Sequence, residues 1–406
     1  MKPKIKNPNK TLYAILLGFL EYTVMFLAIL NFYTPYMQLG IGKYIINYGC
    51  TIVFFLLVIG KKYLKFDSIL LFYMIGAFIP FLNVSRENIS GYIGEFLILV
   101  PLCYMYITSS FKNNNVNSFF CKYSNIVIII AIISLFFWLF GTMLGIVKPT
   151  AYIPHEWGGF RRIPMYYGVY FETQEAFVTV ETQSTIRNSG IFSEAPMYNM
   201  ILCTALGVEL FIRDKKSMWR IILLIITILT TISTTGAIYL VLVFSYILYS
   251  YAGSKFKTFI IFILPLLLIV TLLMTQYVLD NKKQTGEGSY NSRVNDIENC
   301  IEIGMSNPMF GVGLYSENTT YGVNKWGYSN SLFTIFARGG LYMLALYFFC
   351  LFAVPGIVYN NYRKISVFIL SYALLFTFTI AYFNILSFFF LALGLGLWKQ
   401  NLIMQK

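Results

Sequence analysis

The sequence predicts an all-α, polytopic membrane protein. Of its residues, 58% are hydrophobic and only 12% are charged, and the mean hydropathy is +0.67. Two long polar segments, 148–196 and 281–327, interrupt an otherwise nearly continuous series of apolar stretches. A chain this apolar cannot remove its surface from water by folding alone, so the lipid bilayer is its expected solvent. Residues 1–406 are therefore expected to form a single integral membrane domain.

The apolar stretches predict about 12 transmembrane helices, judged against the roughly 20 residues that a full crossing needs. In chain order they are Leu12–Phe32, Tyr44–Gly60, Ser68–Phe81, Gly91–Ser109, Asn125–Val147, Met197–Phe211, Ile221–Ile232, Ala237–Tyr251, Thr258–Leu279, Ser329–Val358, Ile365–Asn384 and Phe388–Trp398.

The basic residues predict the orientation of these helices. With twelve spans, the Lys and Arg residues at the chain termini and after every second span all fall on one side. Short cytoplasmic loops carry this excess, whereas long loops are translocated largely regardless of charge. Both termini are therefore expected in the cytoplasm, and the segments 148–196 and 281–327 are expected to be large external loops. The net charge of +13 is explained by this anchoring, so no nucleic-acid partner is expected.

Several kinds of catalytic site are absent from the sequence. His155 is the only histidine, and no two of the four aspartates form a D-x-D pair. The chain has no nucleotide-binding G-x-x-x-x-G-K-[ST] motif, and the first external segment, 31–42, contains no acidic residue. These absences exclude a multi-histidine metal site and a P-loop. Any catalysis is therefore expected to need no metal and no cofactor.

The first long loop contains the arginines that are best placed for chemistry. Arg161 and Arg162 are adjacent, and Arg187 precedes Glu194 just before an apolar stretch. The guanidinium group binds phosphate or carboxylate through two parallel hydrogen bonds. Glu194 is either an acid that favours the start of a helix or a general base at the membrane face.

The second long loop predicts a short amphipathic helix over residues 290–305. Val294, Ile297, Ile301 and Met305 recur at helical spacing, and Pro308 follows their end. Such a helix is expected to lie on the membrane surface. Arg293 is at its start and is either a solvated charge or a contact for a lipid phosphate.

Polar residues within the apolar stretches are the remaining candidates. Residues 230–236 read T-T-I-S-T-T-G and divide a segment too short for two full crossings, so this turn is expected to line a cavity or to form a helix–helix contact. Glu21, Glu95 and Glu209 lie within spans, where carboxylates are functional candidates. Glu21 and Glu95 suit either a proton relay or protonated structural groups, of which we favour the latter. Glu209 is expected near Arg213.

Three motifs together resemble the O-antigen polymerase and ligase superfamily. Residues 187–196 read R-N-S-G-I-F-S-E-A-P, and residues 229–236 form the hydroxyl-rich turn. Residues 307–314 read N-P-M-F-G-V-G-L, and Y-S-N-S-L-F and G-G-L follow at 328–333 and 339–341. The resemblance covers roughly residues 187–347.

The resemblance implies a GT-C-like glycosyltransferase of the bacterial plasma membrane. Its substrates would be oligosaccharide repeat units on undecaprenyl pyrophosphate, and the growing chain would be transferred onto a new unit at the outer face. Ligases of this superfamily often carry histidine before the asparagine of the third motif, where this chain has Ser329. This departure favours a polymerase of O-antigen or capsular polysaccharide.

The resemblance also assigns the residues of the site. Arg187, Glu194 and Arg293 would be catalytic, and substrate would be bound by Arg161, Arg162, Ser233 and Asn330. Expected partners are the lipid-linked substrates, membrane lipids, and chain-length regulator and flippase proteins. Two alternatives stay open, a ligase and a polysaccharide or lipid flippase. A flippase would be expected to show internal repeats, and none is apparent.

Overall fold

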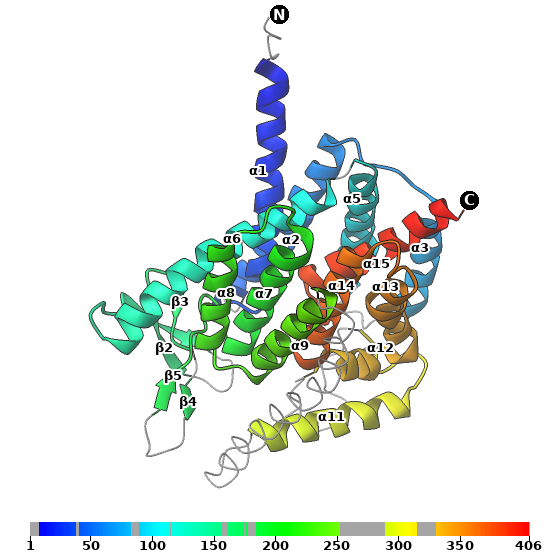
Figure 1. The fold of residues 1–406 in the computed structure, drawn as a ribbon. Helices are drawn as coiled ribbons and strands as arrows, with labels where there is room; N and C mark the ends of the chain where they lie inside the picture. Colours follow the sequence, from blue (N-terminus) through cyan, green and yellow to red (C-terminus); the bar gives the residue numbers. More distant parts are fainter. Residues whose placement is uncertain are drawn as a thin grey trace, which may run out of the picture.

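The computed structural model describes residues 8–37, 40–82, 89–113, 115–155, 161–173, 175–177, 184–251, 289–314 and 330–405. Helices dominate it (Figure 1). In the first half of the chain they are α1 (Pro8–Leu30), η1 (Pro35–Met37), α2 (Gly40–Gly60), α3 (Ser68–Phe81), α4 (Ile89–Tyr92), η3 (Ile93–Leu99), α5 (Val100–Lys112), α6 (Val116–Phe137) and η4 (Trp138–Met143).

The second half continues in the same way. Its helices are α7 (Ala195–Gly207), η5 (Val208–Ile212), α8 (Met218–Thr230), α9 (Thr234–Tyr251), α11 (Ser289–Ser306), α12 (Ser331–Phe348), η6 (Phe349–Ala353), α13 (Val354–Ile357), α14 (Arg363–Phe378) and α15 (Ile385–Met404). The predicted apolar stretches coincide with helices wherever they fall within the described residues, and the stretch Thr258–Leu279 lies outside them.

Within the described residues, 7 helices are long and apolar enough to cross a membrane. Three shorter apolar helices, α3, α8 and α9, accompany them. A polytopic, mainly helical membrane protein is therefore supported, whereas the count of twelve crossings is not reached in the described part of the chain. The short helices α8 and α9 are separated by residues 231–233, as the hydroxyl-rich turn predicted.

The segment 148–196 contains β-structure that the all-α prediction did not include. β1 (Ala151–His155), β2 (Arg161–Tyr166) and β3 (Tyr170–Phe171) form an antiparallel sheet in that order. β4 (Glu175–Phe177) and β5 (Ser184–Ile186) form a second antiparallel pair. Tyrosine, isoleucine and phenylalanine are frequent in this segment and favour strands, which its overall polarity concealed.

Helix α7 with η5 occupies the centre of the bundle. Of this segment, Ala195–Ile212, 94% is buried inside the protein. Helix α15 packs closely against α5 and η6; a Cβ at Gly394 would lie 2.4 Å from the carbonyl oxygen of Cys350. Aromatic side chains fill much of the remaining core, as in the stacked rings of Tyr372 and Phe390. The centre is therefore protein-filled, and the apolar surfaces of helices such as α1 and α3 stay exposed.

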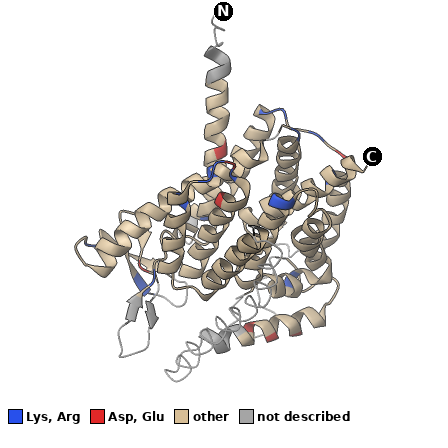
Figure 2. Cartoon of the chain, in the orientation of Figure 1, with Lys and Arg blue, Asp and Glu red and all other residues tan. Residues whose placement is uncertain are grey.

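Ion pairs fix the helices at the end of the bundle that bears the termini. Glu21 accepts hydrogen bonds from Lys61, Lys122 and Tyr106. The expectation of a protonated Glu21 is therefore wrong, because two ammonium groups stabilise its charged form. Figure 2 shows basic residues gathered toward this end.

Two further ion-paired carboxylates, Glu209 and Asp67, share this end. Glu209 is fully buried and pairs with Arg213 at 2.9 Å, as the sequence predicted, and with Arg220 at 2.8 Å. Asp67 caps α3 and pairs with Lys399 of α15. Burial alone would raise the pKa of Asp67, but hydrogen bonds from Lys399, the Leu70 N–H and other donors hold it below its ordinary value.

The strands and α11 lie at the opposite end of the bundle from the N-terminus (Figure 1). Helix α11 crosses this end and packs against α12. Its buried residues include Asp296, Cys300 and Ile303. Ile301 and Met305 of the predicted apolar stripe are 41% and 68% exposed, which is the arrangement that a helix on a membrane surface requires.

We predict that Gly340→Ala destabilises the protein by about 1–3 kcal/mol, because its backbone conformation is open essentially to glycine alone. Gly340 has φ +62° and ψ −167°, and an added Cβ would lie 2.4 Å from the Met309 backbone. The thermal midpoint of detergent-purified protein measures the effect. Gly356→Ala is the control, since its Cβ would meet no atom within 4 Å. Equal midpoints for the two variants would contradict this prediction.

Candidate functional site

The first two motifs are joined directly by hydrogen bonds. The Nε of Arg187 donates to the carbonyl oxygen of Thr231 at 2.8 Å. The Asn188 backbone N–H donates to the Thr230 carbonyl at 3.1 Å, and its side-chain amide donates to the Thr230 hydroxyl at 3.0 Å. Carbonyls left without helical partners at the end of α8 are thus satisfied by the loop. This pairing fixes the guanidinium of Arg187 beside the hydroxyl-rich turn.

The same loop is held on its other side by the sheet and by the turn after α1. The Phe171 N–H donates to the Gly190 carbonyl at 2.9 Å, and the Ser193 N–H donates to the Tyr33 carbonyl at 2.9 Å. Gly190 has φ +56°, and a Cβ there would lie 2.9 Å from the ring of Tyr198. The segment 187–194 is therefore a fixed connection between the sheet and the helices.

The third motif forms a second fixed turn, against a break in α12. The N–H groups of Val312 and Gly313 donate to the carbonyls of Ala337 and Arg338 at 3.0 and 2.9 Å. In the other direction, Leu341 donates to Pro308 at 2.8 Å. Residues 308–313 therefore replace the helical hydrogen bonds that α12 loses at its break.

Arg338 joins this turn to the first motif, and the sequence analysis did not identify it. Its guanidinium lies over the ring of Tyr382, with 5.6 Å between the guanidinium carbon and the ring centroid. Tyr33, whose carbonyl holds Ser193, lies in the same cluster: desolvation and the Tyr382 hydroxyl raise the pKa of Tyr33, while Arg338 acts in the opposite direction. A cation inside the apolar stretch 329–358 was the available signal, because such residues are functional candidates by default.

A group of buried polar side chains lies under the sheet. The ring nitrogens of His155 and the hydroxyls of Thr173 and Ser193 are buried, and they have no hydrogen-bond partner in the described part of the protein. Burial and the Arg161 guanidinium lower the pKa of His155, so its ring is neutral at neutral pH. Buried polar groups need a partner, and a polar ligand such as a sugar hydroxyl would supply one.

The adjacent arginines of the first loop do not share one site. Arg161 pairs with His155 across the sheet, and its guanidinium donates to the Thr173 carbonyl. Arg162 pairs with Pro154 and therefore projects from the other face, because successive side chains of a strand alternate. The side chain of Arg161 therefore lies beside the buried polar group, and the side chain of Arg162 lies on the opposite face of the sheet.

The other predicted residues have distinct positions. Ser233 is half-buried at the start of α9, two residues beyond the carbonyl that holds Arg187. Arg293 is near the start of α11, and the structure describes its backbone only. The structure therefore brings Arg187 and Ser233 together and does not test the position of the Arg293 guanidinium.

Glu194 occupies the N-cap position of α7. Its carbonyl accepts the N–H groups of Met197 and Tyr198, both at 3.2 Å, and its side chain makes no capping hydrogen bond. The half-buried carboxylate therefore does not cap the helix. The general-base hypothesis rests on the position of Glu194 near Arg187 in the chain and on the ability of a carboxylate to accept a proton.

Asn330 caps α12. Its side-chain oxygen accepts the N–H groups of Leu332 and Phe333 at 2.9 and 3.3 Å, and its amide donates to the Thr377 carbonyl. The same side chain was predicted to bind substrate. Both polar atoms already have protein partners, so a direct substrate contact would have to compete with the cap.

No group of three or more His, Cys, Asp or Glu side chains within the described ranges could hold a metal ion. The site as described offers other chemistry. Arginines provide charge for an anion, Glu194 provides a carboxylate, and the buried imidazole and hydroxyls provide neutral hydrogen-bonding groups. This set suits an anionic leaving group next to a hydroxyl-rich substrate.

We predict that Asn330→Ala lowers stability by about 0.5–2 kcal/mol, the usual cost of losing an N-cap. Asn330→Asp keeps the oxygen that caps the helix and should retain more stability. Thermal midpoints of the purified variants measure both effects. An alanine variant that melts with the wild-type protein would show that the cap contributes little and would restore a substrate role for this amide.

A model of the O-antigen ligase family matches residues 219–348. Comparison with curated proteins and with solved structures gave no match. The matched region includes the hydroxyl-rich turn, α11 and all of α12, and it excludes Arg187, which is hydrogen-bonded to that turn. Residues 219–348 therefore resemble the O-antigen ligase family, and this match supports the superfamily that the motifs predicted.

Proposed function

We propose that the protein is a polymerase of oligosaccharide repeat units linked to undecaprenyl pyrophosphate. It would act at the outer face of a bacterial plasma membrane, with both termini in the cytoplasm and about 12 spans. The growing glycan would be transferred from its lipid onto a new lipid-linked unit. The observation that carries the proposal is the contact of Arg187 with the hydroxyl-rich turn, which joins the first motif to the family-matched region.

The proposed reaction needs charge stabilisation and one proton acceptor. A hydroxyl of the incoming unit attacks the anomeric carbon of the growing chain and forms a new C–O bond. The bond from that carbon to the pyrophosphate oxygen breaks, and the lipid pyrophosphate leaves with the electron pair. Arg187 and Arg293 would stabilise the departing phosphates, and Glu194 would take the hydroxyl proton. In-line attack would invert the anomeric configuration.

Substrate recognition is proposed to involve the residues near these groups. Arg161 and the neutral ring of His155 would face the sugar side of the substrate, together with Ser233. No metal or cofactor is required in this scheme, because fixed guanidinium groups supply the positive charge. Lipids, a chain-length regulator and a flippase would be its partners in the membrane.

A polymerase is preferred to a ligase because Ser329 occupies the position where ligases of the superfamily often have histidine. A hydroxyl there cannot serve as an imidazole base. The reaction class is the same for both, since each transfers a glycan from lipid pyrophosphate. The acceptor is what differs between them.

Deletion of the gene tests the polymerase assignment. We predict that single repeat units reach the cell surface and that long polysaccharide disappears, because only the joining of units would be lost. Electrophoresis of surface glycan measures chain length, and a plasmid copy of the gene is the control. Long chains in the deletion strain would reject the polymerase; units missing from the surface altogether would indicate a ligase.

We predict that Arg187→Ala abolishes polymer formation and that Arg187→Lys restores little of it, because lysine lacks the bidentate guanidinium. Lysine also lacks the Nε that donates to Thr231. Polymer per folded protein in the membrane is the measurement. Arg363→Ala is the control, since this arginine is exposed at the other end of the bundle, where it contacts Tyr246 and Ser250. Near-normal polymer from the lysine variant would argue against the phosphate role.

We predict that Glu194→Gln lowers the polymerisation rate by on the order of 10²–10⁴ at unchanged protein level, as expected when a general base is lost. Glutamine keeps the shape and the backbone cap but cannot accept the proton. Initial rates with purified protein and lipid-linked units measure the effect, and Glu302→Gln on the exposed side of α11 is the matched control. A wild-type rate would make Glu194 structural.

A further inference from the structure

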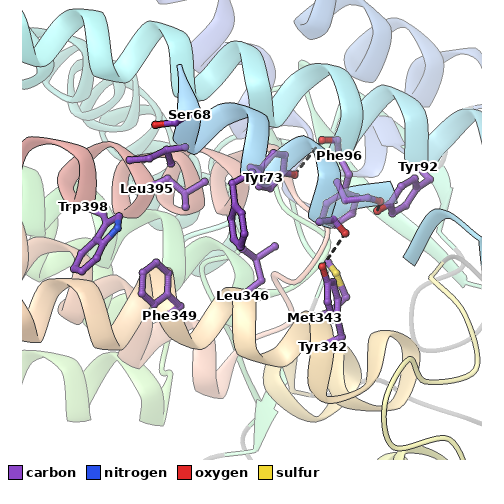
Figure 3. A pocket seen from close by; sticks show the side chains of 14 residues that line it. Ser68, Tyr73, Tyr92, Phe96, Tyr342, Met343, Leu346, Phe349, Leu395 and Trp398 are labelled. Carbon is purple, nitrogen blue, oxygen red and sulfur yellow. Dashed lines mark hydrogen bonds between the residues drawn. The ribbon is translucent and has the colours of Figure 1, made fainter. Parts of the chain in front are cut away.

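An apolar groove runs along the bundle between α3 and α12. Its volume is about 530 Å³, within the range of ligand sites. Helix α3 forms one wall with Phe72, Tyr73 and Gly76, and α12 with η6 forms the other, with Leu346 and Phe349 (Figure 3). Along α3 the lining runs from Ser68 to Ala77, roughly 14 Å at 1.5 Å per residue.

The tyrosine hydroxyls on the groove walls are already satisfied. The hydroxyls of Tyr73, Tyr92 and Tyr342 donate to the carbonyls of Phe96, Ala77 and Gly76 at 3.0, 2.6 and 2.8 Å. Figure 3 marks hydrogen bonds among the residues that line the groove as dashed lines. Of the described residues that line the groove, none is charged. It therefore presents ring faces and aliphatic side chains, which suit a hydrocarbon and not a sugar.

The two ends of the groove differ. At one end Trp398 and Ser68 are next to Lys399 and Asp67, which form an ion pair. At the other end is Tyr342, whose backbone N–H donates to the Met309 carbonyl at 3.1 Å. Met309 belongs to the turn 308–313 that packs against the break in α12. The groove therefore runs from the neutralised Lys399–Asp67 pair to the turn of the third motif. That turn belongs to the family-matched region.

We propose that this groove holds the hydrocarbon chain of the polyprenyl carrier, with its diphosphate end at the Met309–Tyr342 end. The inference rests on the proposed function, because that function supplies a substrate with a long apolar tail and an anionic head. Arg338 is four residues before Tyr342 in the broken helix, and the backbone of the turn contacts both. A tail in the groove would thus bring the head toward the arginine-bearing end of the site.

The position of the charges favours this occupant over a phospholipid of the opposite leaflet. Such a lipid would place its phosphate at the Lys399 end, where the ammonium group is already paired with Asp67. Tyr104 also donates to Asp67, at 2.9 Å, which completes this pair. A polyprenyl carrier in the leaflet at the Met309–Tyr342 end has its diphosphate at the third motif, as the reaction requires.

Photocrosslinking tests the occupant. Benzoylphenylalanine replaces Phe72, which lines the groove and is 80% exposed. The matched control carries it at Phe78, which is also on α3 and 53% exposed, but does not line the groove. Full-length protein in nanodiscs of phosphatidylethanolamine and phosphatidylglycerol is irradiated with a radiolabelled polyprenyl diphosphate. We expect severalfold more adduct at position 72, removed by unlabelled polyprenyl diphosphate and not by added phosphatidylglycerol.

A groove-filling variant provides a second measurement. Leu346→Trp places a larger side chain between the walls and should weaken binding of polyprenyl diphosphate by on the order of tenfold, because the space cannot hold both. Leu341→Trp is the control on the same helix, outside the groove and 49% exposed. Thermal midpoints of both variants check that they are folded.

The outcomes separate this inference from the proposed function. Equal adduct at positions 72 and 78, or a phospholipid adduct at 72, would overturn the groove assignment even if gene deletion removes long polysaccharide. A specific polyprenyl adduct at 72 would support it even if deletion leaves the polysaccharide unchanged, in which case the polymerase assignment alone fails. Wild-type affinity in a folded Leu346→Trp variant would also reject the groove.

Discussion

The structure depends on one constraint: irregular backbone inside an apolar bundle must find hydrogen-bond partners within the protein. In hydrocarbon an unpaired N–H or C=O costs several kcal/mol. The described chain is irregular in three places near the site, at residues 187–194, 230–233 and 308–313, and α12 breaks at Gly340. The first two pair with each other, and the third pairs with the break. The irregular segments lie close together because the backbone groups of one form hydrogen bonds with those of another.

The same pairing prepares the site for chemistry. A guanidinium that donates to a fixed carbonyl loses less freedom when an anion arrives, and pre-oriented groups stabilise a developing charge at little reorganisation cost. Arg187 gains this from Thr231, and the guanidinium of Arg338 lies over the ring of Tyr382, 5.6 Å from its centroid. The glycines of the motifs serve this packing, since a Cβ at Gly311 would lie 2.4 Å from the Arg338 backbone. The hydrogen bonds that fix the irregular backbone therefore also orient the charged side chains of the site.

Sequence patterns predicted the parts of this fold that follow from hydrophobicity. The apolar stretches, the divided segment at 231–233 and the helix over 289–306 follow from local composition and periodicity. The strands of the first loop, the separation of Arg161 from Arg162 and the cap made by Asn330 could not be predicted, because each depends on partners distant in the chain. Arg338 was visible as a cation in an apolar stretch, and only its neighbours make it part of the site.

The carboxylates within the helices bear on the class of function. A proton-coupled transporter needs an intramembrane carboxylate that can exchange its proton, and Glu21 and Glu95 were the candidates for this. Glu21 is held between two ammonium groups, and Glu209 is buried against two guanidinium groups. Charge neutralisation of this kind anchors helix ends. The carboxylates of Glu21 and Glu209 are therefore accounted for by structural ion pairs, which favours the irregular end of the bundle as the place for chemistry.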